Sequence, residues 1–129
     1  MLPVVVLLAF ALFDAGRAVI FYSELTNASR AGARVAMVNQ SNDATCNPSD
    51  ALTFRCAASR QTTGMGIAPS AIPPLTITGT ECALIGNCAA TVTVSYSYVP
   101  VTPVISQLIG SINLVASSTM PIERSYASP

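Results

Sequence analysis

The first 38 residues of this 129-residue chain form one continuous stretch of helical composition with two different halves. Residues 1–13, MLPVVVLLAFALF, are entirely apolar. From Asp14 to Val38 the composition still favours a helix, but polar and apolar residues now fall on different sides of it. A single helix with these two halves predicts two environments, namely lipid or other helices around its first half and a small folded domain beside its second half.

The apolar run is shorter than the roughly 20 residues that cross a bilayer. Extending it to Tyr22 gives a spanning length but includes Asp14 and Arg17. These residues are three apart, so on a helix they share one face and can neutralise each other. Two interpretations stay open. The charges mark the membrane boundary, or one or both of them pair with the helix of a neighbouring subunit.

A cleaved signal peptide is the weaker interpretation of this segment, because no basic residue precedes the apolar run and no clear cleavage motif follows it. We therefore expect residues 1–22 to form a hydrophobic helix segment in a membrane or a filament core. Residues 23–129 are expected to form the folded domain. The residues that we expect to mediate assembly are Val4, Val5, Val6, Leu7, Leu8, Phe10, Leu12, Phe13, Asp14 and Arg17.

Small residues recur every four positions in the second half of the helix, at Ala28, Gly32 and Ala36. Such a row lets another backbone approach closely. Glycine costs roughly 1 kcal/mol inside a helix, so Gly32 suggests a packing contact. Packing against the chain's own sheet is the favoured explanation, and a helix contact between subunits is the alternative.

The remaining elements predict a small α+β domain. The long helix should end near Asn39, and a second helix is expected at about 49–62, capped by Ser49 or Asp50. Strands are expected at 75–79, 90–99 and 112–122. In the second of these, apolar residues alternate with Ser and Thr, which predicts an antiparallel sheet packed on one side only, with the long helix as its cover. Between the last two strands we expect one apolar helical turn that caps the core or contacts a neighbour.

Four cysteines, Cys46, Cys56, Cys82 and Cys88, lie beyond the apolar segment. Their spacing fits no metal site, so two disulfides are expected, with three possible connectivities. The local pairs are favoured. If the second helix began at residue 48, however, about 1.5 Å of rise per residue would place the first two cysteines too far apart. Either that helix begins at residue 50 or later, or the chain folds back, or the pairing differs.

The composition argues against several function classes. The six Arg and six acidic residues give no net charge, so nothing supplies the phosphate affinity that nucleic-acid binding needs. The chain has no His and no Lys, which leaves a serine nucleophile without an evident base. We therefore expect no enzyme activity, no cofactor, no metal and no small-molecule substrate.

The N-terminal stretch resembles the TadE-like family, the pilin-related proteins of tight-adherence (Flp/Tad) systems. The matching positions are Leu2-Pro3, Asp14, Gly16-Arg17, Thr26-Asn27-Ala28, Arg30 and Gly32-Ala33-Arg34. The segments Val94–Tyr98, Pro103 and Ile112–Met120 are more weakly similar to the C-terminal half of the family. Family precursors usually carry a basic leader, a glycine processing site and an early glutamate upstream of the Leu-Pro. The sequence printed here contains none of these, so it identifies no processing site.

The resemblance implies a pilin-like α+β fold, with a long N-terminal helix packed on a small antiparallel sheet and a short second helix. It implies a structural subunit that is anchored in the membrane and then polymerises, with itself or with related pilin-like subunits, into a filament at the cell surface. The alternative is a single-span accessory subunit, such as a minor pseudopilin or a component of a membrane complex.

Overall fold

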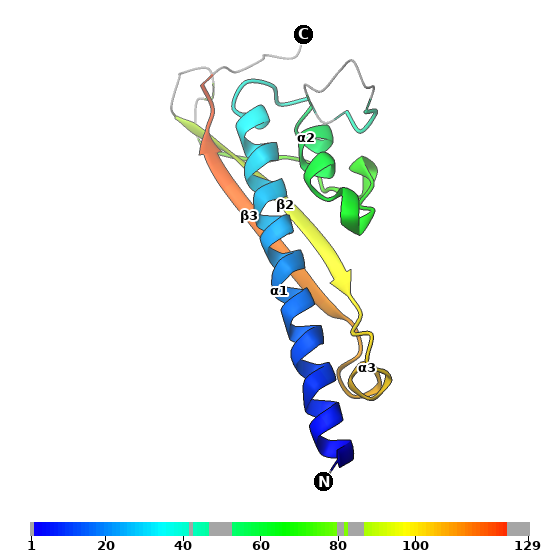
Figure 1. Ribbon diagram of the computed structural model, residues 1–129. Coiled ribbons are helices and arrows are strands. Elements are labelled where there is room, and N and C mark those ends of the chain that lie inside the picture. The colour runs from blue at the N-terminus through cyan, green and yellow to red at the C-terminus, as the bar shows by residue number, and fades with distance from the viewer. Residues whose placement is uncertain (1, 42, 47–52, 80–81, 83–86, 124–129) are drawn as a thin grey trace.

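A computed structural model describes residues 2–41, 43–46, 53–79, 82 and 87–123 of the chain. The α+β arrangement predicted from the sequence is confirmed: a long N-terminal helix lies along a three-stranded antiparallel sheet, with further short helices (Figure 1). The elements in chain order are α1 (Leu2–Ala36), α2 (Phe54–Gln61), two short 3-10 helices (Thr63–Met65 and Pro69–Ala71), β1 (Thr76–Gly79), β2 (Cys88–Tyr98), α3 (Pro103–Ile109) and β3 (Ile112–Pro121).

Helix α1 contributes to the core only through its second half. Its first buried apolar residue is Leu25, and small residues continue the same face to Ala36, where the helix ends three residues before the predicted position. Gly32 lies where α1, α2 and β2 meet. A Cβ atom placed there would lie 3.0 Å from Cγ1 of Val92 and 3.1 Å from the carbonyl oxygen of Phe54. The small-residue row therefore packs inside the subunit, against its own sheet and second helix.

The sheet has the order β1-β2-β3, with both pairs antiparallel. The inner face of β2 carries Val92 and Val94, which are buried, whereas Ser95 and Ser97 are exposed. Val94 lies opposite Ala116 of β3, which is also buried. The predicted alternation is therefore confirmed, and the long helix covers the apolar face.

Helix α2 begins at Phe54, about five residues later than the sequence predicted. The proposed caps Ser49 and Asp50 lie outside the described residues. A disulfide joins Cys46 to Cys56 with 5.5 Å between their Cα atoms. A helix running through both cysteines would hold them too far apart for a bridge, so the later start of α2 is compatible with this pairing.

The second disulfide joins Cys82 to Cys88, with 5.2 Å between Cα atoms. It ties the chain ahead of β2 to the first residue of that strand. Both bridges are thus local pairs, the connectivity that the sequence favoured, and both lie beyond the half of α1 that leaves its apolar residues exposed.

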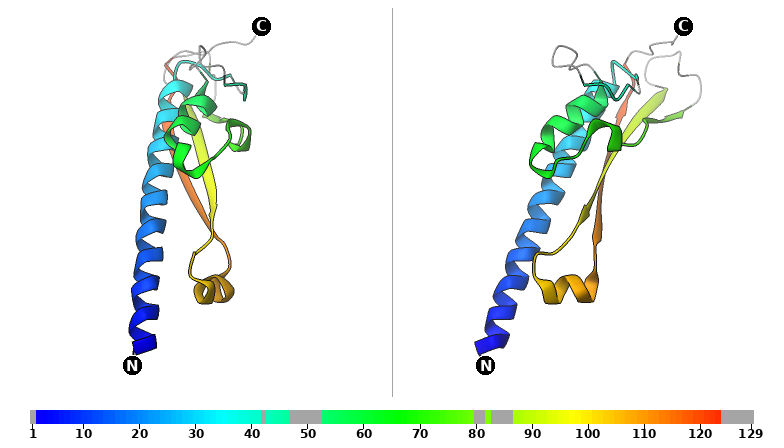
Figure 2. Two further views of the ribbon diagram at one scale, coloured as in Figure 1. Left: turned by 45° about the vertical axis from the view of Figure 1, so that its right-hand side comes forward. Right: turned by 90° about the vertical axis from the view of Figure 1, so that its right-hand side faces the viewer.

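The connection between β2 and β3 differs from its prediction. It forms a seven-residue helix, α3, rather than a single turn. Its apolar residues do not cap the core, because Val104, Leu108 and Ile109 are exposed. Figures 1 and 2 show α3 beside the first third of α1, far from the core at the other end of the sheet.

Candidate assembly surface

The first part of α1 is an apolar surface that the subunit itself leaves uncovered. Its 18-residue window of highest mean hydropathy reaches 2.2, and only 6% of that window is buried. In length and composition it could cross a membrane, and the low burial distinguishes it from the core helix of a soluble protein. The exposed large apolar residues on this helix are Leu2, Val4, Val5, Val6, Leu7, Leu8, Phe10, Leu12, Phe13, Val19, Ile20 and Tyr22.

The β2–β3 connection adds a second exposed apolar surface near the first. Val101 precedes α3, and Val104, Leu108 and Ile109 lie on it. No residue between Cys82 and Ile122 carries a formal charge, so this surface is free of charged side chains. Apolar area of this kind on a subunit marks a protein or membrane contact more often than a solvated surface.

Asp14 joins these two surfaces. The hydroxyl of Thr102 donates to Oδ2 of Asp14 at 2.6 Å, and the backbone N–H of Thr102 donates to the same oxygen at 3.1 Å. The backbone N–H of Val101 donates to Oδ1 at 3.3 Å. The hydroxyl of Tyr98 completes the contact by donating to the backbone carbonyl of Asp14 at 3.1 Å. Burial raises the pKa of this phenol, which keeps it protonated as a donor.

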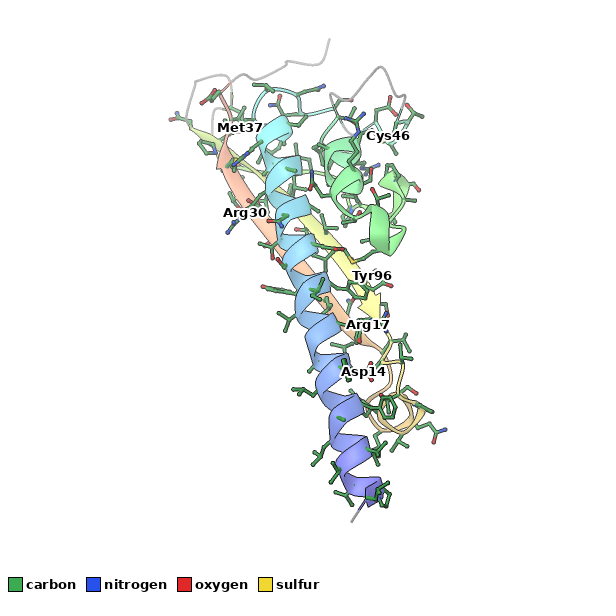
Figure 3. The ribbon with its side chains drawn as sticks, viewed as in Figure 1. Asp14, Arg17, Arg30, Met37, Cys46 and Tyr96 are labelled. Carbon is green, nitrogen blue, oxygen red and sulfur yellow. A yellow bond between two sulfur atoms is a disulfide. The ribbon has the colours of Figure 1, made fainter. Side chains whose placement is uncertain are left out.

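These contacts give Asp14 partners that the sequence did not predict. The residue is only 8% exposed, so it is not a solvated charge at a membrane boundary. Its hydrogen-bond partners come from the β2–β3 connection and not from Arg17. The guanidinium carbon of Arg17 instead lies 5.6 Å from the centre of the Phe21 ring, as in a cation–π contact. Figure 3 shows both Asp14 and Arg17 on α1 near the lower end of β2.

Aromatic rings lie just beyond Arg17. Phe21 of α1 makes edge contacts with Tyr96 and Tyr98 of β2, with 5.6 Å between ring centres in both pairs. Tyr22 is exposed on the adjoining turn of the helix. This cluster lies where the exposed half of α1 ends and the packed half begins, because Leu25 follows as the first buried apolar residue.

A pocket of about 300 Å³ opens between α1 and the connection. Its walls are almost entirely apolar, and Asp14 and Arg17 lie at its side. Within the described ranges no three His, Cys, Asp or Glu side chains gather as a metal site would require. The lining residues are Phe10, Phe13, Asp14, Arg17, Val101, Thr102 and Pro103.

Sequence reasoning missed Thr102 and Tyr98 as partners of Asp14. They lie 88 and 84 residues away along the chain, and no local pattern connects them to the helix. The one available signal was Thr102-Pro103, since threonine followed by proline is typical of a helix start. That signal predicts the start of α3 but not the residue against which it packs.

Residues 1–34 match the family model of TadE-like proteins. The N-terminal resemblance predicted from the sequence is therefore confirmed, and the TadE-like segment contains every residue of the α1 surface. The match ends before α2 and the sheet, so the weaker C-terminal resemblance stays a prediction. Searches of the curated proteins and of the solved structures found no match. TadE-like proteins are a pilus-related structural family and not an enzymatic one, and an apolar N-terminal helix fits membrane anchoring.

Proposed function

We propose that this chain is a pilin-like structural subunit that polymerises through the exposed part of α1. Residues 1–22 hold the subunit in the membrane before assembly and lie in the filament core after it, whereas residues 23–129 form the pilin-like domain. The partners are further copies of the chain or related pilin-like subunits, and the assembled filament lies at the cell surface. The observation that carries the proposal is the apolar surface of α1, which nothing in the folded subunit covers.

The size of this surface suits an assembly held without covalent links. Between Val4 and Phe13 lie eight large apolar side chains, all of them partly or largely exposed. Covering such a side chain fully contributes about 1.5–3 kcal/mol, so the segment supplies on the order of 10–20 kcal/mol before the entropic cost of association. A polymer whose subunits each cover this area is therefore stable against dissociation.

The aromatic cluster supports a membrane boundary close to residue 22. Tyrosine and other aromatic rings are enriched where a spanning helix meets the headgroup region, and arginine near the end of a span reaches outward with its charged tip. Arg17, Phe21 and Tyr22 follow one another in this order on α1. The segment from Leu2 to Phe21 also has the length of about 20 residues that a bilayer requires.

Electron microscopy of the sheared extracellular fraction tests the proposal. Negative-stain images should show fibres, and peptide mass spectrometry of the purified fibres should identify this chain. If the chain occurs only in detergent extracts of membranes, it is the single-span accessory subunit of the alternative hypothesis, and the filament proposal is wrong.

A further inference from the structure

We propose that α3, together with Val101 before it, is a second membrane contact that lies in the leaflet next to the folded domain while the subunit is anchored. The occupant of this apolar surface is the acyl-chain region of the bilayer. The inference rests on the proposed function, because it takes the first part of α1 as the membrane segment. It goes beyond that function by assigning a lipid contact to a part of the chain far from the anchor in sequence.

The depth of α3 relative to the anchor is the first argument. Wherever the membrane span begins along α1, a bilayer that covers the whole apolar run extends at least to the depth of Phe13. The pocket between α1 and the connection places Pro103 at the same level, because Phe10, Phe13 and Pro103 line it together. Figures 1 and 2 show the whole of α3 beside the first third of α1. Lipid around the anchor therefore also surrounds α3.

The composition of the segment is the second argument. Residues 99–111 contain no charged side chain, and most of their exposed side chains are aliphatic, with Gln107 and Ser111 as the exposed polar ones. Leu108 is 80% exposed, and Val101, Val104 and Ile109 are exposed beside it. The surface continues the apolar surface of α1 across a pocket with almost entirely apolar walls. α3 itself carries no charge that would oppose its transfer from water into the hydrocarbon region, and the nearby carboxylate of Asp14 accepts hydrogen bonds from the connection.

The backbone of the connection is the third argument. A loop at membrane depth must satisfy its polar backbone groups inside the protein, since lipid offers no hydrogen bonds. Pro100 and Pro103 have no N–H group, and the N–H groups of Val101 and Thr102 both donate to Asp14. This explains why a carboxylate stands in an otherwise apolar segment. Asp14 accepts the hydrogen bonds of the irregular backbone where the chain leaves β2. In doing so, it holds α3 at the depth of the anchor.

A contact with lipid is favoured over a contact with a second copy by the order of events. Asp14 ties α3 to the anchor within one chain, so the two enter the bilayer together before any neighbouring subunit is present. Until assembly, no other subunit is available to cover the apolar surface of α3 at membrane depth. Lipid is therefore the first contact that this surface meets.

Tryptophan fluorescence of the full chain in vesicles tests the proposal, because the natural sequence contains no tryptophan. Three variants each carry one probe. Leu108→Trp reports on α3, Leu12→Trp on the anchor, and Val38→Trp on the turn that follows the far end of α1. All three replaced side chains are exposed, at 80%, 76% and 45%, so the substitutions leave the core unchanged. Each variant is placed in phosphatidylcholine vesicles with and without bromine on the acyl chains, which quenches only a tryptophan that contacts them.

The proposal expects brominated lipid to quench Leu108→Trp and Leu12→Trp to a similar extent and to leave Val38→Trp bright. If Leu12→Trp is quenched while Leu108→Trp stays as bright as Val38→Trp, α3 does not contact lipid, and the inference is wrong although the anchor stands. The Leu108→Trp emission could instead move to shorter wavelength as the amount of protein per vesicle rises, without quenching by bromine. In that case a second copy covers α3, and the inference is again wrong. An unquenched Leu12→Trp refutes the anchor and the inference together.

Discussion

The two halves of α1 belong to one uninterrupted helix, yet they meet opposite surroundings. From Leu25 to Ala36 the helix packs through small residues against β2 and α2, closely enough that a methyl group at Gly32 would press on Val92 and Phe54. From Leu2 to Tyr22 it exposes large apolar side chains and contacts the rest of the chain mainly through Asp14 and the aromatic cluster. Packing of the domain therefore accounts for the second half, whereas the proposed function assigns the exposed apolar residues of the first half to a membrane or to neighbouring subunits.

The same contrast divides the whole molecule. We call residues 2–22 and 99–111 the lower half and the other described residues the upper half. The lower half contains Asp14 and Arg17 as its charged residues, and it leaves large apolar side chains exposed, although Asp14 and Phe21 contact tyrosines of β2. The upper half holds both disulfides and the buried core. Substitutions in the upper half should therefore change stability, and substitutions in the lower half should change assembly.

A charge on the exposed face of α1 should have the largest effect. We expect Leu8→Asp, like Val6→Asp, to abolish filaments, because an aspartate at the centre of a span costs roughly 2.5–3.5 kcal/mol. The matched control is Ile77→Asp in β1, where another exposed aliphatic side chain lies in the upper half and should tolerate the charge. Filament yield in the sheared fraction is the measurement. Normal yield from Leu8→Asp, or equal loss from both variants, would remove the distinction between the halves.

Loss of a disulfide should destabilise the upper half. Each bridge closes a short loop, for which chain entropy predicts a contribution of about 2–3 kcal/mol to the free energy of unfolding. Replacing Cys46 and Cys56 together by serine should lower the urea midpoint in detergent, measured by circular dichroism, without changing membrane insertion. The native protein should be four hydrogens lighter before reduction than after it. Free thiols that react with iodoacetamide, or a peptide linking Cys46 to Cys82 or Cys88, would contradict the pairing.

Two glycines of the same helix provide a smaller and closely matched comparison. Replacing glycine by alanine inside a helix stabilises the helix by roughly 1 kcal/mol at either position. A Cβ atom at Gly16 meets nothing within 4 Å, so Gly16→Ala should be neutral or stabilising. A Cβ atom at Gly32 meets Val92, Phe54 and Ala58 at 3.0–3.3 Å, and overpacking of this kind costs about 1–3 kcal/mol. Urea unfolding should give a lower free energy of unfolding for Gly32→Ala than for Gly16→Ala. An equal increase of this free energy in both variants would disprove close packing at Gly32.

The most local effect concerns Asp14. Asp14→Ala removes the acceptor of two backbone N–H groups, so the amides of Val101 and Thr102 should exchange hydrogen faster, as mass spectrometry of the peptide can measure. Arg17→Ala should leave their protection unchanged. The double variant Asp14→Arg, Arg17→Asp should not restore protection, because arginine cannot accept a hydrogen bond. Restored protection in the double variant would show that an ion pair, and not the connection, is the partner of Asp14.

The sequence predicted those features whose cause is local. The alternation of apolar and polar residues around Val92 and Val94 indicates a strand with one buried face. The short spacing of Cys82 and Cys88 favours a bridge between them. The apolar composition of α1 and its TadE-like pattern likewise lie within one segment. Each of these predictions needs only the neighbours of a residue along the chain.

The features that were missed depend on contacts between distant segments. The start of α2 at Phe54 is later than helix propensity predicted, although the spacing of Cys46 and Cys56 left a start at residue 50 or later open. The hydrogen bond between Asp14 and Thr102 crosses 88 residues, so the spacing of Asp14 and Arg17 on the helix could not reveal it. The exposure of Leu108 depends on where the β2–β3 connection folds, and the apolar character of this segment left open whether it caps the core or contacts a neighbour.

A cryo-electron microscopy reconstruction of the sheared fibres tests most directly whether the lower half is the assembly surface. It should show the first part of α1 from each copy in the filament core, with Phe10, Leu12 and Phe13 covered by neighbouring helices and the upper half facing outward. Fibres held together by contacts between upper halves, with these three side chains exposed to solvent, would contradict the account. So would fibres that do not contain this chain.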